Sequence, residues 1–532
     1  MLSRPSNLFV RARFFDRIND MPAKVYSAAV IGLDAQVIEV EVDCSYGLRY
    51  FSIVGLPDKS VEEARERVGT AIKSTKLSSP HQKPLRVLVN LAPADLKKEG
   101  ALYDLPIALG FLLASKQTNF NPEGKIFLGE LSLNGKLRPI KGALSVALMA
   151  RDNFSEIILP KDNAKEAAIV LTQSSDQSTD KFKVVGVDNL KETLDYLEGK
   201  HAIIPTVPTS PDKISSIGFS EMDFIKGQEY AKRALEIVAG GGHNLLMVGP
   251  PGAGKTLLAK SLPALLPPLS FEESLEVTRI YSVAGLLPKE QPIMVNRPFR
   301  NPHHTASETA LIGGGNPPRP GEITLAHRGI LFLDEFPEFH RDALESLRQP
   351  IEEGKITILR ARHSLTLPSR FTLVSAANPC PCGNFNNPEK ECACNHHQIQ
   401  TYRKKLSGPL MDRIDLFVDV PQLKYEKLVS PEQNNLWLSI RKKVQDARSL
   451  QKARFANDQV NSELTIQQIK QYCQVDGNSQ NLLRKYVDSG KLSARGYHRT
   501  LKIARTIADL DNSEKISYEH LSEALMYRAK EI

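Results

Sequence analysis

The stretch NLLMVGPPGAGKTLLAKSLPALL, residues 244–266, joins an apolar strand-like run to an apolar helix-like run through a glycine-rich turn. It fits the pattern G-x-x-x-x-G-K-[ST], in which backbone N–H groups of the turn converge on phosphate oxygens. Lys255 then brings a cation to the β- and γ-phosphates, and the hydroxyl of Thr256 is placed to coordinate Mg²⁺. The pattern by itself can arise by chance, but here the strand and the helix that a phosphate loop requires stand on either side of it. We therefore expect an α/β core with a nucleotide site made by Gly249, Pro250, Pro251, Gly252, Ala253, Gly254, Lys255 and Thr256.

Two later apolar runs end in polar side chains that suit the same site. HRGILFLDEFPEF, residues 327–339, reaches Asp334 and Glu335, and RFTLVSAANPC, residues 370–380, reaches Asn378. Ligands of open α/β sheets lie at the carboxyl ends of the strands. Asp334 is expected to hold Mg²⁺ directly or through water, Glu335 to orient or deprotonate an attacking water, and Asn378 to position that water against the γ-phosphate. Paired acids at strand ends are common and Asn often caps turns, but the phosphate loop favours the hydrolytic interpretation.

Length and composition indicate a globular protein of several domains. The chain has 532 residues, of which 41% are hydrophobic and 24% charged, and its length suggests about three domains. No run approaches the ~20 apolar residues that cross a bilayer, so we expect no membrane insertion. Six cysteines do not make a disulfide scaffold and indicate a reducing compartment, the cytoplasm. The net charge of +8 is mild and only permits a nucleic-acid partner.

Changes in composition and secondary-structure pattern along the chain predict five parts. Residues 1–20 are expected to be a disordered leader, and residues 21–199 alternate short strands and helices in an α+β domain. A Pro- and Ser-rich linker covers residues 200–217. Residues 218–425 form the α/β core, and residues 426–532 form a helical C-terminal domain.

Four of the cysteines crowd into NPCPCGNFNNPEKECACN, residues 378–395. Four thiolates in one loop can close a tetrahedral Zn²⁺ site that stabilises a loop too polar to pack by itself. We expect structural zinc on Cys380, Cys382, Cys392 and Cys394, with His396 or His397 able to replace one sulfur. Unliganded thiols and redox pairs remain open alternatives. A catalytic metal is disfavoured because four protein ligands leave no open position.

The stretch GKITILRARHSLTLP, residues 354–368, predicts a β-hairpin with a basic tip. Its two β-branched runs flank Arg360, Arg362 and His363. An ordinary solvated turn is the alternative interpretation of the tip.

Together these residues resemble the AAA+ ATPases. The stretches RPFRNPHHTASETALIGGG (297–315), NPCPCG (378–383) and LSGPLMDRIDL (406–416) narrow the resemblance to the ComM/YifB-type magnesium-chelatase-like AAA+ family, from Met21 to the C-terminus. This resemblance implies a P-loop AAA+ parallel sheet with a helical lid, and ATP with Mg²⁺ as substrate and cofactor. It also implies a second substrate or subunit contact in residues 297–315, where a metal on His303 and His304 is disfavoured by the lack of a third ligand.

The resemblance further implies roles for individual basic residues. Arg413 matches an arginine finger that reaches the neighbouring subunit's ATP, which requires an oligomer, expected to be a hexameric ring. Arg495 matches the lid arginine called sensor 2, with a solvated first-turn residue as the alternative. The hairpin with Arg360, Arg362 and His363 stands where related motors face the central pore, so its tips are expected to contact DNA phosphates.

The N-terminal domain resembles the Lon protease domain, but without its catalytic dyad. Apolar or aromatic residues around Leu102 and Tyr103 occupy the serine position, and Leu144 occupies the lysine position. Lys141 is nearby, but it has no serine to activate. We therefore expect an α+β scaffold without peptidase activity.

The resemblance favours an ATP-dependent DNA motor that promotes branch migration of recombination intermediates during DNA uptake or repair, acting on single-stranded and branched DNA. The alternative is a chelatase-type motor that remodels a partner protein for metal insertion. An ATP-dependent protease is disfavoured because the nucleophile is missing.

Overall fold

The computed structural model describes residues 22–173, 182–208, 225–288, 290–315, 318–360, 363–385, 390–405, 408, 410–423 and 436–528. The predicted leader, residues 1–20, lies outside the described residues, as does the linker from residue 209 onward. The chain divides into two compact units: Met1–Ser210 with Gly285–Pro292, and Pro211–Ala284 with Ile293–Ile532. The five-part division of the sequence stays a prediction.

The first unit is built on a mixed seven-stranded sheet in the order β3-β4-β2-β1-β5-β8-β9. β2 is antiparallel to β1 and β4, and the remaining neighbours are parallel. Inward positions alternate along β4, whose burial pattern is that of a strand with one covered face. The helix α3 is buried almost throughout and packs on β1 and β2. This arrangement is the predicted α+β domain.

The strands of this unit are β1 (Ala23–Ile31), β2 (Asp34–Tyr46), β3 (Tyr50–Val54), β4 (Leu85–Ala92), β5 (Lys125–Phe127), β6 (Glu130–Leu131), β7 (Leu137–Arg138), β8 (Glu156–Pro160) and β9 (Lys183–Val187). Its helices are α1 (Lys59–Glu62), α2 (Ala64–Ser74), α3 (Asp104–Ala114), α4 (Ala143–Asn153), α5 (Lys161–Ala167) and α6 (Leu190–Leu197).

The second unit is built on a five-stranded sheet in the order β11-β14-β17-β10-β18, with every pair of neighbours parallel. Its central strands are continuous apolar runs, as expected where both faces are covered. Parallel pairing brings the carboxyl ends of β10, β14 and β17 to one edge. The sheet confirms the predicted α/β fold class with a P-loop-type parallel sheet.

The strands of the second unit are β10 (Leu245–Val248), β11 (Phe299–Arg300), β12 (Gly313–Gly314), β13 (Arg319–Pro320), β14 (Ile330–Leu333), β15 (Lys355–Arg360), β16 (His363–Pro368), β17 (Thr372–Ala377) and β18 (Leu416–Asp419). The helices around the sheet are α7 (Glu229–Gly241), α8 (Lys255–Leu265), α9 (Phe271–Ala284), α10 (Glu308–Ile312), α11 (Glu322–Leu325), α12 (Arg341–Glu345), α13 (Arg348–Glu353) and α14 (His396–Lys405). The C-terminal helices are α16 (Leu436–Phe455), α17 (Ile466–Tyr472), α18 (Gly477–Asp488), α19 (Ala494–Leu510) and α20 (Tyr518–Met526).

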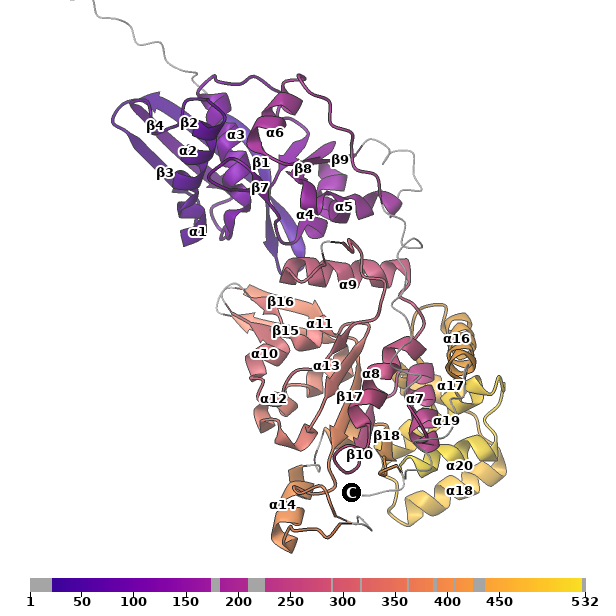
Figure 1. Cartoon of the computed structure of the whole chain (residues 1–532). Coiled ribbons are helices and arrows are strands. Elements are labelled where there is room, and N and C mark those ends of the chain that lie inside the picture. Colours follow the sequence, from indigo (N-terminus) through magenta and orange to yellow (C-terminus); the bar gives the residue numbers. More distant parts are fainter. Residues whose placement is uncertain are drawn as a thin grey trace, which may run out of the picture. The chain divides into compact units, whose positions relative to one another are not determined.

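The C-terminal helices form the predicted lid and pack beside α7 (Figure 1). The longest buried stripe belongs to α19, whose start is capped by the side chain of Ser493. Apolar side chains of this helix share one core with β10, β17 and β18. Among the described residues, no helix is long and apolar enough to cross a membrane.

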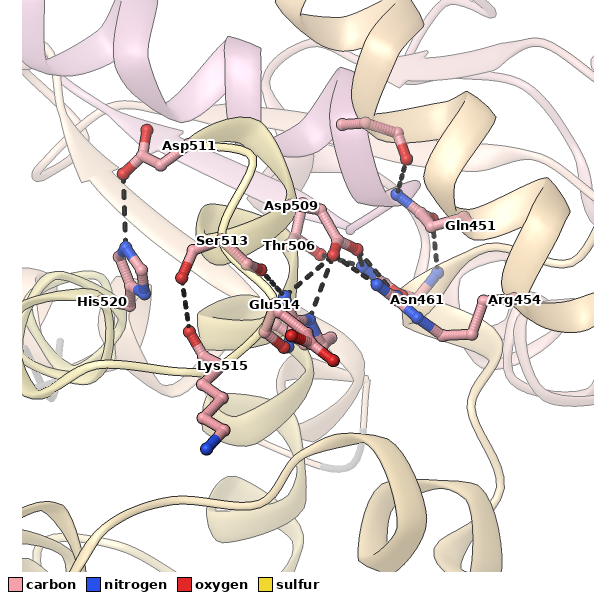
Figure 2. Close-up of polar contacts among 12 residues, drawn as sticks. Gln451, Arg454, Asn461, Thr506, Asp509, Asp511, Ser513, Glu514, Lys515 and His520 are labelled. Atoms are coloured by element: carbon pink, nitrogen blue, oxygen red, sulfur yellow. Dashed lines mark hydrogen bonds and ion pairs between the residues drawn. The ribbon is translucent and has the colours of Figure 1, made fainter.

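A buried polar network ties the lid together (Figure 2), and one contact joins it to the residue His243 beside the sheet. Asp509 is fully buried and accepts hydrogen bonds from Arg454 at 2.6 and 2.9 Å and from Asn461 at 2.8 Å. Asn461 also donates to the hydroxyl of Thr506, which in turn lies 2.7 Å from Nε2 of His243, next to β10. Because buried polar groups are costly unless paired, this network fixes the lid on the sheet.

Candidate nucleotide site and the opposite sheet edge

The turn between β10 and α8 needs glycine where its backbone runs close to other strands. A Cβ on Gly249 would lie 2.1 Å from the carbonyl oxygen of Val420, at the end of β18. Gly252 and Gly254 adopt left-handed conformations, with φ of 77° and 91°. Gly254 precedes the first turn of α8, so the loop presents N–H groups and the positive end of the helix to the same space. The turn therefore has the geometry expected of a phosphate loop.

Lys255 lies over the loop and connects it to β17. Its ammonium donates hydrogen bonds to the carbonyl oxygens of Gly249 (2.6 Å) and Pro250 (3.0 Å) and to Oδ1 of Asn378 (3.1 Å). Burial lowers the pKa of Lys255, and the nearby carboxylates of Asp334 and Glu335 oppose this shift. A partly desolvated cation at this position is suited to bind phosphate oxygens. These oxygens can replace the carbonyl oxygens as acceptors of its hydrogen bonds.

Thr256 and Asp334 come together from α8 and the end of β14. The Thr256 hydroxyl donates to Oδ2 of Asp334 at 2.8 Å. A hydroxyl and a carboxylate in contact form a hard oxygen donor pair, and Mg²⁺ uses such ligands together with waters and substrate phosphates. These two residues therefore fit the metal that the sequence predicts.

Glu335 lies at the same strand end in a left-handed conformation, with φ of 52°. Its backbone N–H donates to Oδ1 of Asp334 at 3.0 Å, and its carboxylate lies 3.1 Å from Nδ1 of His304. The sequence interpretation placed His304 in a substrate or subunit contact and missed this pairing. Adjacent histidines in NPHHT gave no signal that one of them reaches an acid more than thirty residues later, because only the parallel pairing of β11 with β14 brings them together.

Gln228 is a second residue that the sequence interpretation missed. It precedes α7 with φ of 57°, and its amide nitrogen donates to the carbonyl oxygens of Pro421 (2.6 Å) and Ala253 (3.4 Å). Gln228 thereby connects the phosphate loop to the segment after β18. A lone glutamine before a helix carries no recognisable motif.

Arg413 and Arg495 lie at the other edge of the sheet. The carbonyl oxygen of Arg413 accepts a hydrogen bond from the side chain of Asn244, which precedes β10, whereas the phosphate loop follows β10. Arg495, at the start of α19, lies 3.7 Å from Asp412, the neighbour of Arg413 in the chain. Both arginines line a cavity of about 890 Å³ at this edge. They are thus separated by the length of β10 from the phosphate loop of the same chain.

Acidic groups accompany these arginines. Arg413 is 9% exposed and forms an ion pair with Glu352 of α13. Arg499 of α19 donates to Asp415 at 2.8 Å, and His243 lies 3.6 Å from the same carboxylate. Burial by itself would raise the pKa of Asp415, but Arg499, His243 and the backbone N–H of Asn244 together hold it well below its ordinary value. The edge is a cluster of compensated charges rather than an unbalanced basic patch.

The four cysteines gather in one cluster. Their sulfur atoms all lie within 4.8 Å of one another, and individual pairs lie 3.4, 3.6 and 3.7 Å apart. A tetrahedral zinc site with bonds of about 2.3 Å places its sulfurs about 3.8 Å apart, so the cluster fits such an ion. The loop also touches the nucleotide site, because a Cβ on Gly383 would lie 2.4 Å from Cδ of Pro251. Neither His396 nor His397 is part of this cluster among the described residues.

The predicted hairpin is present as β15 and β16. They pair antiparallel from Lys355 with Pro368 to Arg360 with His363. Its root is fixed by the buried side chains of Ile356, Ile358 and Leu367. Arg362 lies outside the described residues, as do the side chains of Arg360 and His363, so their contact with DNA stays a prediction.

In the first unit, the positions compared with a protease dyad are part of the core. Tyr103 is 1% exposed and Leu144 is fully buried. Neither side chain offers a nucleophile or a base to a substrate, and Lys141 lies in the exposed turn before α4. The Lon-like character of the unit and its lack of peptidase activity stay predictions.

Comparison with known proteins identifies three matching families along the chain. Residues 221–428 match the family described as magnesium chelatase, subunit ChlI; residues 40–163 match subunit ChlI of Mg-chelatase; and residues 438–528 match magnesium chelatase, subunit ChlI C-terminal. The chain therefore contains a magnesium-chelatase-type AAA+ domain, which implies an ATPase.

Individual relatives extend the likeness over nearly the whole chain. The uncharacterized protein YifB of Escherichia coli strain K12 is 42% identical over 509 residues, covering 95% of this chain and 96% of YifB. The competence protein ComM of Haemophilus influenzae is 41% identical over 516 residues, covering 95% of this chain and 97% of ComM. The DNA replication licensing factor Mcm2 of Drosophila melanogaster is 24% identical over 229 residues, covering 40% of this chain and 22% of Mcm2.

Proposed function

Because the chain belongs to the YifB/ComM family of magnesium-chelatase-like proteins, we propose that it is a DNA-stimulated ATPase that works as a hexameric ring and drives branch migration of recombination intermediates. The observation that carries the proposal is the identity of 41% with a competence protein along 95% of the chain, since competence is the uptake of DNA. DNA uptake or repair is the corresponding cellular setting.

The residues at the carboxyl edge of the sheet can carry out ATP hydrolysis. The loop N–H groups and Lys255 bind the phosphates, and Thr256 and Asp334 hold the Mg²⁺ that neutralises phosphate charge. Glu335 takes the proton of the attacking water, and His304 orients its carboxylate at a contact of 3.1 Å. Asn378, 3.1 Å from Lys255, holds the water in line with the γ-phosphate.

The opposite edge supports hydrolysis between subunits. Arg413 and Arg495 are too far from their own phosphate loop to stabilise charge on its γ-phosphate, so their partner is the ATP of a neighbouring subunit. A head-to-tail interface of this kind closes into a ring when the rotation between subunits allows it. The family resemblance supports a ring of six.

DNA contact is assigned to the β15–β16 hairpin. The phosphate backbone supplies most of the affinity in sequence-independent binding, and arginines recognise it without reading bases. Six tips carrying Arg360, Arg362 and His363 would form a basic collar around single-stranded or branched DNA. The likeness to Mcm2, named as a DNA replication factor, favours this partner.

The alternative is a motor that remodels a partner protein for metal insertion, which the chelatase family descriptions favour. The two functions differ in what stimulates hydrolysis. We would measure the ATPase rate of the purified protein alone, with single-stranded DNA and with a four-way junction, at low and moderate salt. Stimulation that is greatest with the junction is expected. No stimulation by any DNA would overturn the DNA motor in favour of the protein-remodelling motor.

A further inference from the structure

Glu352 is placed between two parts of the motor that the proposed function keeps separate. It lies near the end of α13, and its carboxylate forms an ion pair with Nη2 of Arg413. Only Glu353 and Gly354 separate it from Lys355, the first residue of β15. One acidic residue therefore contacts the predicted arginine finger and is covalently attached to the root of the predicted DNA hairpin.

The connection from α13 to the hairpin is short and well packed. Gly354 ends the helix in a left-handed conformation, φ 64°, and its N–H donates to the carbonyl oxygen of Pro350 at 2.9 Å. Its own carbonyl oxygen accepts from the N–H of Ser369, the residue after β16, at 2.8 Å. A Cβ on Gly354 would lie 2.9 Å from the side chain of Arg370, so the two ends of the hairpin and the end of α13 are in contact. A displacement of the hairpin root must therefore move Glu352.

The root of the hairpin and the predicted arginine finger line the same cavity. Glu352, Gly354, Ser369 and Arg370 line the cavity of about 890 Å³ together with Arg413 and Arg495. Arg413 is held from the other side by the sheet, through the hydrogen bond from Asn244 to its carbonyl oxygen. The backbone of the finger is thus fixed, and its guanidinium is the part that can change partner.

We propose, as a deepening of the DNA-stimulated ATPase above, that Glu352 is a positioning residue that holds Arg413 within its own subunit until the hairpin binds DNA. A carboxylate and a γ-phosphate compete for the same guanidinium, since each offers a pair of oxygen atoms that the planar fork of arginine can bind. Displacement of the hairpin root by DNA withdraws Glu352 and releases Arg413 to the neighbouring subunit's ATP. The ion pair in this way makes hydrolysis depend on DNA.

Glu353→Gln supplies a matched control for Glu352→Gln. Both residues are exposed and lie on the same helix, and each substitution removes one negative charge. The two differ in their partners, because the carboxylate of Glu353 accepts a hydrogen bond from Gln349 at 3.1 Å. Glu352→Gln is expected to raise the ATPase rate without DNA by about two- to fivefold, the factor that an ion pair with one solvent-exposed partner contributes. Its ratio of DNA-stimulated to basal rate should fall by the same factor, while Glu353→Gln keeps both values of the wild type. Glu352→Asp, whose shorter side chain withdraws the carboxylate from Arg413, should behave like Glu352→Gln.

The double variant Glu352→Gln/Arg413→Ala distinguishes release of the finger from a general effect on the motor. The double variant should hydrolyse ATP at the low residual rate of Arg413→Ala alone, because no finger remains to be released. Basal and stimulated rates of Glu352→Gln equal to those of Glu353→Gln would overturn the proposal, as would a rise that persists without Arg413. A wild type that no DNA stimulates would instead contradict the proposed function, and the role of Glu352 would then stand or fall on its basal rate.

Discussion

At the scale of single residues, Asp415 is the charge on which the sheet edge with Arg413 and Arg495 depends. It is buried, and it accepts from Arg499 at 2.8 Å and from the backbone N–H of Asn244 at 2.9 Å. Replacing one member of a buried pair leaves the other charge uncompensated. Asp415→Asn should therefore destabilise the second unit by about 3 kcal/mol, measured by denaturant unfolding at neutral pH. Asp412→Asn, at a side chain that is 58% exposed, is the control and should change stability little.

The pH dependence of this unit should carry the signature of the same residue. Because the folded state holds the pKa of Asp415 below its ordinary value of 3.8, the folded state binds fewer protons than the unfolded chain. The stabilising contribution is complete above about pH 4 and is lost as the pH falls further. Asp415→Asn should lack this loss, so the difference in unfolding free energy between wild type and variant should shrink below pH 4. A difference that stays constant with pH would contradict the assignment.

Local motifs predicted residues that the structure brings together at the carboxyl edge of the sheet, whereas other contacts there depend on long-range packing. Gly249 to Thr256 form a continuous pattern whose geometry is set by neighbours in the chain. The contacts of His304 with Glu335 and of Glu352 with Arg413 join positions that are far apart in sequence. No local pattern specifies such pairs, because they depend on the sheet order and on where α13 ends. Gln228 was missed for the same reason.

At the scale of elements, the cysteine loop is packed as a support of the phosphate loop. Cys380 follows Asn378 by two residues, and Gly383 lies against Pro251. Cys380→Ser/Cys382→Ser should lower bound zinc from about one ion per chain to near zero and weaken ATP binding, because the loop loses the ion that shapes it. Zinc content by atomic spectroscopy and the Kd of a fluorescent ATP analogue measure the two effects.

Cys473→Ser provides the comparison for this loop, since Cys473 is buried away from the cluster, in the lid. It should retain zinc and the wild-type Kd. Unchanged zinc content in the loop variant would rule out the four-sulfur site. Loss of zinc with unchanged ATP affinity would limit the metal to the loop itself.

The hairpin is the element to which DNA binding is assigned. Arg360→Ala/Arg362→Ala should leave the ATPase rate without DNA unchanged and weaken DNA binding. The slope of log Kd against log salt should fall by about 2, because two phosphate contacts are lost. Lys442→Ala/Lys443→Ala, which removes two exposed charges from α16, should keep the wild-type slope. Equal DNA stimulation and salt dependence in the two double variants would show that the hairpin tip is an ordinary solvated turn that does not bind DNA.

At the scale of the whole molecule, the proposed function divides one active site between two subunits, which meet through opposite edges of the motor sheet. The carboxyl edge carries Lys255, Asp334 and Glu335, and the amino edge carries Arg413. On this proposal each subunit is incomplete as an ATPase, and turnover is expected to require contact between copies. The ion pairs of Arg413 with Glu352 and of Arg499 with Asp415 compensate the charge of the amino edge in the absence of a bound phosphate.

Mixing variants tests this division directly. Glu335→Gln alone should bind ATP but not hydrolyse it, because the general base is lost, and Arg413→Ala alone should keep only a low residual rate. In equimolar mixed rings, about one interface in four joins an Arg413→Ala subunit, which keeps Glu335, to a Glu335→Gln subunit, which supplies Arg413. Activity should therefore return to about a quarter of the wild-type rate if the sites act independently. Mixing Glu335→Gln with Glu335→Gln/Arg413→Ala restores no complete interface and should stay inactive. If no mixture of the two single variants exceeds the residual rate of Arg413→Ala while rings assemble normally, Arg413 acts within its own subunit and the division of the site between neighbours is wrong.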